Sequence, residues 1–269
     1  MFRPSDKNLS ELALTLIQPY TTALAINDIF IGSGTFVSCD DHHGILTAQH
    51  VAREIKPRKD GTFRIVVTSD MEHAFRIPAC FLEIIDIGIP ISNEYGPDIS
   101  FIKIPHIFLS GIKCRKLFFN ISNKRDEYLT SLSNSDICIW TMYCITNKSH
   151  SKGSGEKFGV VLRQEFIPYI FTDIDNYLEK AGFDYIEVVA KFPDSERHPS
   201  SFGGTSGAAI WKSPFKQIAK DRVELIDPIL AGVVFFETEL VNCKRTLRCH
   251  GYKTLYDQVY STLSDLEHI

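Results

Sequence analysis

The 269-residue chain has no hydrophobic run long enough to cross a membrane and no excess of basic residues. A membrane-spanning helix needs roughly 18 consecutive apolar residues, and the apolar runs here are shorter. The formal net charge of −4 argues against a nucleic-acid partner, because such partners select basic surfaces. The first residues, Met1–Lys7, do not lead into the apolar core of a secretion signal. We therefore expect a soluble, cytoplasmic protein without a membrane partner.

The cysteines show no pattern typical of disulfides or of a metal site. They number seven, an odd count, and several lie inside apolar runs, which is typical of small core residues in a reducing compartment. A site built from Cys243, Cys249 and His250, with Cys39 or His42, is conceivable, but its spacing is unlike a C-x-x-C pair. We expect no metal and no organic cofactor.

From about residue 22 the chain is a series of short runs rich in Ile, Val, Phe and Thr, separated by Gly, Pro, Asn and Asp. Few helices lie between these runs, so the pattern favours antiparallel barrels or sandwiches over parallel βαβ units. Helices are expected at residues 8–17 and 252–266. Exposed loops are expected at 147–156 and 213–228, although the middle of the second could hold a turn of helix. The expected strands are Ala23–Ile31, Gly34–Cys39, Gly44–Thr47, Phe63–Ser69, Phe75–Ile85, Ile99–Ile104, Asp136–Thr146, Lys157–Thr172, Tyr185–Ala190, Ala208–Trp211 and Ile229–Phe236.

Three residues at expected strand edges could carry chemistry together. His50 follows the second strand of a hairpin, Asp98 opens a strand after Gly-Pro, and Ser206 lies in the glycine-rich stretch 200–211. Each has an ordinary alternative, namely a surface histidine, a turn acid and a glycine loop. Together they form a set in which a carboxylate could orient an imidazole, and the imidazole could activate a hydroxyl.

In these segments the chain resembles the trypsin-like (chymotrypsin-fold) serine proteases. The resemblance implies an all-β fold of two antiparallel six-stranded β-barrels, and the closing helix fits it too. The helix expected at residues 8–17 precedes the barrels. The resemblance places a first barrel with His50 and Asp98 at about 22–120, a second with Ser206 at about 121–250, and the closing helix at 251–269, all in one peptidase unit. The matching blocks are Gly34-Thr35-Phe36-Val37, Leu46-Thr47-Ala48-Gln49-His50-Val51, Asp98-Ile99-Ser100-Phe101-Ile102, Gly204-Thr205-Ser206-Gly207-Ala208 and Leu230-Ala231-Gly232-Val233-Val234.

The resemblance also implies a role for each residue of the site. Ser206 would attack the scissile carbonyl, His50 would take and return the proton, and Asp98 would orient His50. The backbone N–H groups of Gly204 and Ser206 would form the oxyanion hole. An α/β-hydrolase site is disfavoured, because it has glycine two residues after the serine, where this chain has Ala208, and its histidine comes last.

Activation and specificity depart from the secreted members of that family. Thr205 stands where those members have an aspartate that pairs with a new N-terminus, so the resemblance points to bacterial and viral members without that step. By the family's spacing Ser200 would lie at the floor of the primary pocket, which would then be uncharged. Phe235, Phe236 and Glu237 would line the substrate edge, although Glu237 could equally be a solvated loop acid.

These observations predict a serine endopeptidase acting on a specific intracellular protein or peptide substrate. A regulatory protein partner could complete the oxyanion hole. The alternative is a trypsin-like fold that binds or senses with little catalysis, and acyl transfer to a non-peptide also stays open.

Overall fold

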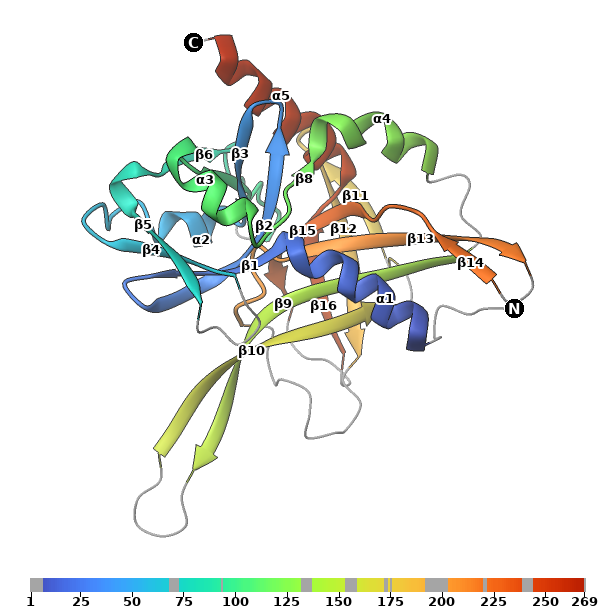
Figure 1. The fold of residues 1–269 in the computed structure, drawn as a ribbon, viewed down its shortest axis with the longest axis horizontal. Coiled ribbons are helices and arrows are strands. Elements are labelled where there is room, and N and C mark those ends of the chain that lie inside the picture. The colour runs from blue at the N-terminus through green and yellow to red at the C-terminus, as the bar shows by residue number, and fades with distance from the viewer. Residues whose placement is uncertain are drawn as a thin grey trace.

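The computed structural model contains two β-sheets with helices at both ends of the chain (Figure 1). The described residues are 7–67, 73–92, 94–131, 137–152, 159–171, 174, 176–191, 203–219, 222–238 and 244–268. Antiparallel pairing prevails in both sheets, as expected for hairpin-connected strands. Within the described segments, no helix combines the length and apolar character that crossing a bilayer requires.

The first sheet has the strand order β5-β4-β1-β2-β3-β7-β6, and β8 adds to β2 in parallel. Short helices lie between its strands: α2 (Gln49–Arg53) after β3, η2 (Ala79–Phe81) after β5 and α3 (His106–Lys113) after β7. The strands are β1 (Thr21–Ile26), β2 (Ile29–Cys39), β3 (His42–Thr47), β4 (Thr62–Val66), β5 (Ala74–Pro78), β6 (Glu83–Asp86), β7 (Ser100–Lys103) and β8 (Phe119–Asn120).

The second sheet has the order β10-β9-β13-β15-β16-β12-β11, and β14 pairs with β13. In the described residues, the ladders run from β5 to β6 and from β10 to β11 without joining their ends, so closed barrels stay a prediction. The strands are β9 (Ile137–Lys152), β10 (Gly159–Phe171), β11 (Asn176–Lys180), β12 (Phe183–Lys191), β13 (Ala209–Ala219), β14 (Arg222–Leu225), β15 (Ile229–Glu237) and β16 (Lys244–His250).

The two expected terminal helices are present. The N-terminal helix α1 (Lys7–Ile17) packs on β9 and buries Leu9, Ala13 and Ile17, whereas Leu12 is exposed. A 3₁₀ turn, η1 (Gln18–Tyr20), follows it. The C-terminal segment is helical through η3 (Thr254–Val259), α5 (Tyr260–Ser264) and η4 (Asp265–His268). A further helix, α4 (Ile121–Ser131), links the two sheets and was not expected from the sequence.

Several expected element boundaries were wrong. The run 23–31 is two strands, because Asn27 and Asp28 adopt left-handed φ values of 50° and 65° and turn the chain. The expected loop at 147–156 begins as strand, since β9 pairs with β10 as far as Lys152. The expected loop at 213–228 is mostly strand, since β13 continues to Ala219 and pairs with β14. Strands β11 and β16 were missed altogether.

The largest hydrophobic cluster draws residues from both sheets. Trp211 of β13 is fully buried, and its ring packs edge-on against Phe119 of β8 and at a tilt against Tyr20. Val37 and Leu46 of the first sheet belong to the same cluster. Truncating a buried aromatic side chain such as Trp211 to alanine costs roughly 3–5 kcal/mol. This shared core fixes the edges of the two sheets, where the candidate site lies, relative to one another.

Candidate active site

His50 and Asp98 are brought together by neighbouring strands of the first sheet. His50 lies at the start of α2, just after β3, and Asp98 lies just before β7. Strands β3 and β7 pair with Thr47 opposite Ser100, so both functional residues leave the sheet at the same end. The hairpin that ends just before His50 and the strand that begins just after Asp98 are therefore neighbours in the sheet.

The carboxylate of Asp98 holds His50 at two points. Its Oδ2 lies 2.6 Å from His50 Nδ1, and its Oδ1 accepts the backbone N–H of His50 at 2.8 Å. Burial alone would raise the pKa of Asp98, but the hydrogen bonds and charge of His50 outweigh it and hold this pKa below its ordinary value. The ionised carboxylate can only accept hydrogen bonds, so Nδ1 of His50 carries the proton.

The remaining ring nitrogen of His50 is available for proton transfer. The side chain of His50 is 48% exposed, compared with 15% for Asp98. Nε2 has no hydrogen-bond partner among the described residues. In the tautomer set by Asp98 this nitrogen carries a lone pair, as a general base requires.

Ser206 lies in a tight turn that only glycines allow. Gly204 and Gly207 adopt φ values of 99° and 87°, in the left-handed region. A Cβ on Gly207 would lie 2.1 Å from both Ser33 O and Thr47 Oγ1, so the turn approaches β2 and β3 more closely than any side chain permits. The glycines of the motif are thus explained by the packing of the turn against the first sheet.

Hydrogen bonds attach the serine turn to both sheets. Ser33 of β2 donates its N–H to Ser206 O at 2.9 Å and its Oγ–H to Gly204 O at 2.8 Å. On the other side, Gly207 N–H donates to Val234 O of β15 at 2.8 Å. Val234 N–H in turn donates to the carbonyl of Ala208 at 2.9 Å. Ser206 therefore lies where the two sheets meet.

The serine turn and the His50 helix lie on either side of one glycine. A Cβ on Gly32 would be 2.7 Å from Cγ2 of Val51, the neighbour of His50, and 3.0 Å from Ser206 O. The structure thus brings the three predicted residues into one region. It does not join Ser206 Oγ to His50 Nε2, since no hydrogen bond links them among the described residues.

The expected oxyanion-hole donors are the backbone N–H groups of the residues on either side of Thr205. Within the described part of the chain, the backbone N–H groups of Gly204 and Ser206 have no hydrogen-bond partner. Thr205 between them is buried, and its carbonyl accepts the N–H of Ala208 at 2.7 Å. Two free N–H groups beside a serine are the donors that an oxyanion requires, provided that they point to the same position.

His250 lies beside Asp98, although its position in the sequence suggested only a possible metal ligand. Its Nε2 accepts the backbone N–H of Asp98 at 3.0 Å, and its ring stacks on Phe235 with centroids 4.5 Å apart. Burial lowers the pKa of His250 to about 3, only partly offset by the charge of Asp98, so the ring is neutral. Asp98 is therefore flanked by two histidines. No local motif marks His250, because it ends the strand β16 that the sequence pattern did not reveal.

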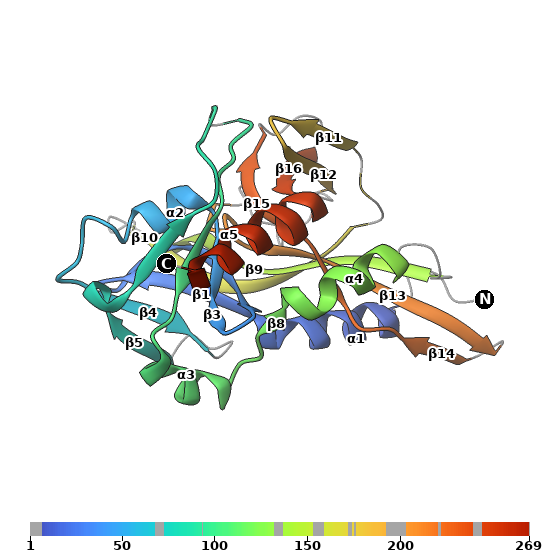
Figure 2. The same ribbon diagram turned by 90° about the horizontal axis from the view of Figure 1, so that it is seen from above.

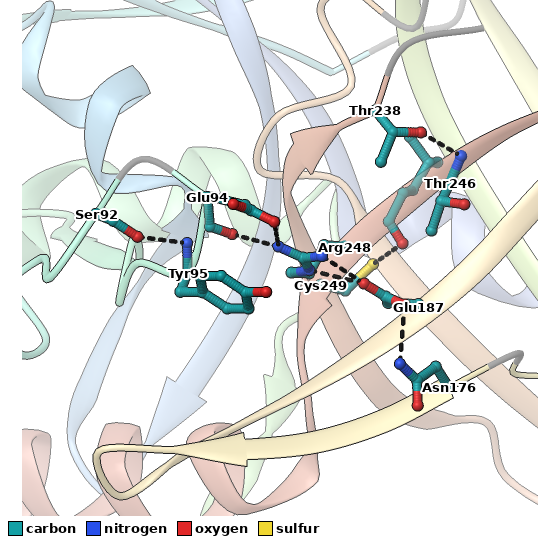
Figure 3. Close-up of polar contacts among 10 residues, drawn as sticks. Ser92, Glu94, Tyr95, Asn176, Glu187, Thr238, Thr246, Arg248 and Cys249 are labelled. Atoms are coloured by element: carbon teal, nitrogen blue, oxygen red, sulfur yellow. Dashed lines mark hydrogen bonds and ion pairs between the residues drawn. The ribbon is translucent and has the colours of Figure 1, made fainter. Parts of the chain in front are cut away.

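Arg248, two residues earlier, fixes the segment that leads to Asp98 (Figure 3). Its Nε and Nη2 donate to Glu187 Oε1 of β12 at 2.8 and 2.6 Å. Its Nη1 donates to the carbonyl of Glu94 at 2.8 Å, and its guanidinium lies 4.5 Å from the ring centre of Tyr95. The second sheet thereby holds the chain just before Asp98, although Asp98 belongs to the first.

The expected substrate-edge residues have different surroundings. Ser200 lies outside the described residues. Phe235 is buried against Tyr185 and His250, and Phe236 is half-buried with its ring centre 5.6 Å from the guanidinium of Arg248. Glu237 forms an ion pair with Arg245 on the neighbouring strand. Contact of these residues with a substrate stays a prediction.

The described residues include no group of three side chains placed to hold a metal ion. Cys243, part of the conceivable metal site, lies outside them. Cys39 and Cys249 are buried free thiols, and burial raises the pKa of each. Buried thiols of raised pKa are poor ligands and poor nucleophiles.

Comparison with known proteins does not assign the chain to a family. No family model matches it, and no curated protein is similar to it. Among solved structures, one reported in a study of coupled folding and binding of the intrinsically disordered Sesbania mosaic virus VPg protein covers 90% of this chain and 90% of its own. Its TM-score is 0.43 and its identity 11%, values too low to support a conclusion about fold or function.

Proposed function

We propose that this protein is a serine endopeptidase of the trypsin-like type, with Ser206, His50 and Asp98 as its catalytic residues. The observation that carries the proposal is the two-point contact of Asp98 with His50, which sets both the ring orientation and the tautomer of the imidazole. A solvated surface histidine needs neither a fixed ring orientation nor a fixed tautomer. The proposal includes the closed barrels and the division at about residue 120 that the family resemblance implies.

In the proposed reaction, His50 Nε2 takes the proton of Ser206 as Oγ bonds to the scissile carbonyl carbon. The N–H groups of Gly204 and Ser206 stabilise the negative charge on the carbonyl oxygen, and one such donor is worth roughly 3–4 kcal/mol. His50 returns the proton to the leaving amine as the C–N bond breaks. Water then hydrolyses the acyl-enzyme by the same proton transfers, releasing the acid and restoring Ser206.

The proposed reaction requires a hydrogen bond between Ser206 Oγ and His50 Nε2, which is absent among the described residues. Ser206 is only partly buried, so its Oγ can change rotamer while His50 keeps both contacts with Asp98. Catalytic hydrogen bonds often tighten only when substrate is bound. A protein target or a regulatory partner could bring the two side chains into contact. Thr205 excludes the activating salt bridge with a new N-terminus that the secreted enzymes use.

The second candidate is a binding or sensing module with this fold. The missing hydrogen bond between Ser206 and His50, two residues that the structure describes, favours it. Such a module would bind peptides in the same region without cleaving them. The two candidates predict different outcomes for a mixture of peptide substrates.

Incubation with a peptide library, read by mass spectrometry, tests the proposal. The wild-type protein should cleave a subset of peptides, and Ser206→Ala should cleave none while keeping its melting temperature. Ser261→Ala, an exposed serine on α5, is the matched control and should cleave like the wild type. Peptides that are retained but never cut would favour the binding module.

A further inference from the structure

A basic pocket lies on the first sheet, away from the candidate active site. It has a volume of about 370 Å³ and is formed by β4, β5 and the chain just after α3. Figure 2 shows α3 beside this hairpin, and the ring of Phe75 packs against Gly111 of α3. Strands β4, β1 and β2 separate β5 from β3, which leads to His50.

Three arginines line the pocket, and two of them face each other across the hairpin. Arg64 of β4 is the direct cross-strand partner of Arg76 of β5, and Arg115 joins them from the end of α3. Like charges directly opposite on neighbouring strands are destabilising. Such an arrangement is unexpected in a chain of net charge −4, unless an anion normally occupies the pocket.

The described residues supply little negative charge to these arginines. Asp28, itself 73% exposed, forms an ion pair with Arg64. The guanidinium groups of Arg76 and Arg115 have no hydrogen bond or ion pair to any part of the chain that the structure describes. Arg64 Nε is buried and has no acceptor there either. A buried donor without an acceptor is costly, and an anionic ligand would supply the acceptor.

We propose that this pocket binds an organic phosphate, such as a nucleoside monophosphate. Guanidinium groups match the geometry of phosphate oxygens and bind them through paired N–H groups. The volume exceeds that of a bare phosphate and lies in the range of small-molecule sites. Val67, Ala74 and Phe75 add apolar wall that suits an organic group.

Isothermal titration at low salt with inorganic phosphate and with adenosine 5′-monophosphate tests the proposal. The monophosphate should bind the wild-type protein, and Arg76→Gln with Arg115→Gln should weaken binding by about tenfold or more. Both arginines are exposed, so this variant should keep the wild-type melting temperature. The matched control, Arg125→Gln with Arg222→Gln, removes the same charge from α4 and β14 and should bind like the wild type.

The two ligands separate the possible sources of the phosphate. Tighter binding of the monophosphate supports an organic ligand, whereas equal affinity for both would overturn the organic assignment in favour of free phosphate. Absence of binding, or equal loss in the control variant, would overturn the site itself. Asp70 and Glu72 lie in the connection between β4 and β5, outside the described residues. Binding seen only after Asp70→Asn with Glu72→Gln would mean that the chain's own acids fill the pocket, against the proposal.

Discussion

Asp98 contacts both the ring and the backbone of His50, through two different carboxylate oxygens. The first contact fixes the tautomer, and the second fixes the start of α2 on which the ring is carried. His250 accepts the backbone N–H of Asp98 from the opposite side. The acid is thus held between two histidines of opposite character, one half-exposed and one fully buried.

The lowered pKa of Asp98 makes its contribution to stability depend on pH. A carboxyl whose folded-state pKa lies below the unfolded value stabilises the fold above the unfolded pKa of about 4, and loses this effect as pH falls through the folded pKa. Asp98→Asn should therefore lower the melting temperature most at neutral pH, and the difference from the wild type should shrink below about pH 4. Thermal unfolding across this range measures it. A difference that stays constant down to the lowest pH would contradict the ionised assignment.

His250 should act on the site through Asp98 rather than through its own proton. His250→Phe keeps an aromatic ring on Phe235 but leaves the N–H of Asp98 without its acceptor, a loss of roughly 1–3 kcal/mol. His250→Gln can place its amide oxygen near the position of Nε2 and should recover part of this. Urea unfolding measures stability, and the NMR shift of the His50 Nδ1 proton reports on the Asp98 contact. If the phenylalanine variant leaves that shift unchanged, His250 is merely a core residue.

Arg248 and Glu187 should behave as a coupled pair. Arg248 is almost fully buried, so Arg248→Met leaves the Glu187 carboxylate largely desolvated and should destabilise the fold by roughly 3–5 kcal/mol. Arg248→Met combined with Glu187→Gln removes both charges and should be less harmful than the single change. A double-mutant cycle by urea unfolding measures the coupling. Simple additivity of the two changes would show that the ion pair drawn in Figure 3 contributes no coupling energy.

Gly207 and Gly182 provide a matched test of the serine turn. Both have φ above 80°, so alanine at either position meets the left-handed penalty of roughly 1–2 kcal/mol. A Cβ on Gly182 meets nothing within 4 Å, whereas one on Gly207 meets Ser33 O and Thr47 Oγ1 at 2.1 Å. Gly207→Ala should therefore lower the melting temperature well beyond Gly182→Ala. Equal effects of the two substitutions would mean that the turn does not approach the first sheet as described.

The sequence predicted best those features that depend on short stretches. The glycine turn around Ser206 and the strand edges at His50 and Asp98 are local, and antiparallel pairing then brought the last two together. The segment 213–228 was wrongly predicted to be a loop, because Pro214 and several charged side chains are typical of loops. Pro214 still fits in β13, where its carbonyl accepts the N–H of Ile226. The order of polar and apolar residues within a segment does not predict which strands will pair with it.

His250 and Arg248 could not be predicted because their roles are long-range. Their contacts to Asp98 and Glu94 span 152 and 154 residues of sequence. Both are polar residues in the segment Lys244–His250, where buried Leu247 and Cys249 alternate with them. In an exposed strand Arg248 and His250 would face solvent. Here aromatic side chains of neighbouring strands and the segment before Asp98 cover them.

Labelling with a fluorophosphonate probe, followed by peptide mapping, tests the central claim most directly. The probe reacts with a serine only when a neighbouring base and an oxyanion hole activate it. We expect a single adduct on Ser206 in the wild-type protein, its loss in Ser206→Ala, and strong slowing of labelling in Asp98→Asn. A wild-type protein that remains unlabelled, alone and in extracts of its own cells, would contradict the assignment of Ser206 as a nucleophile.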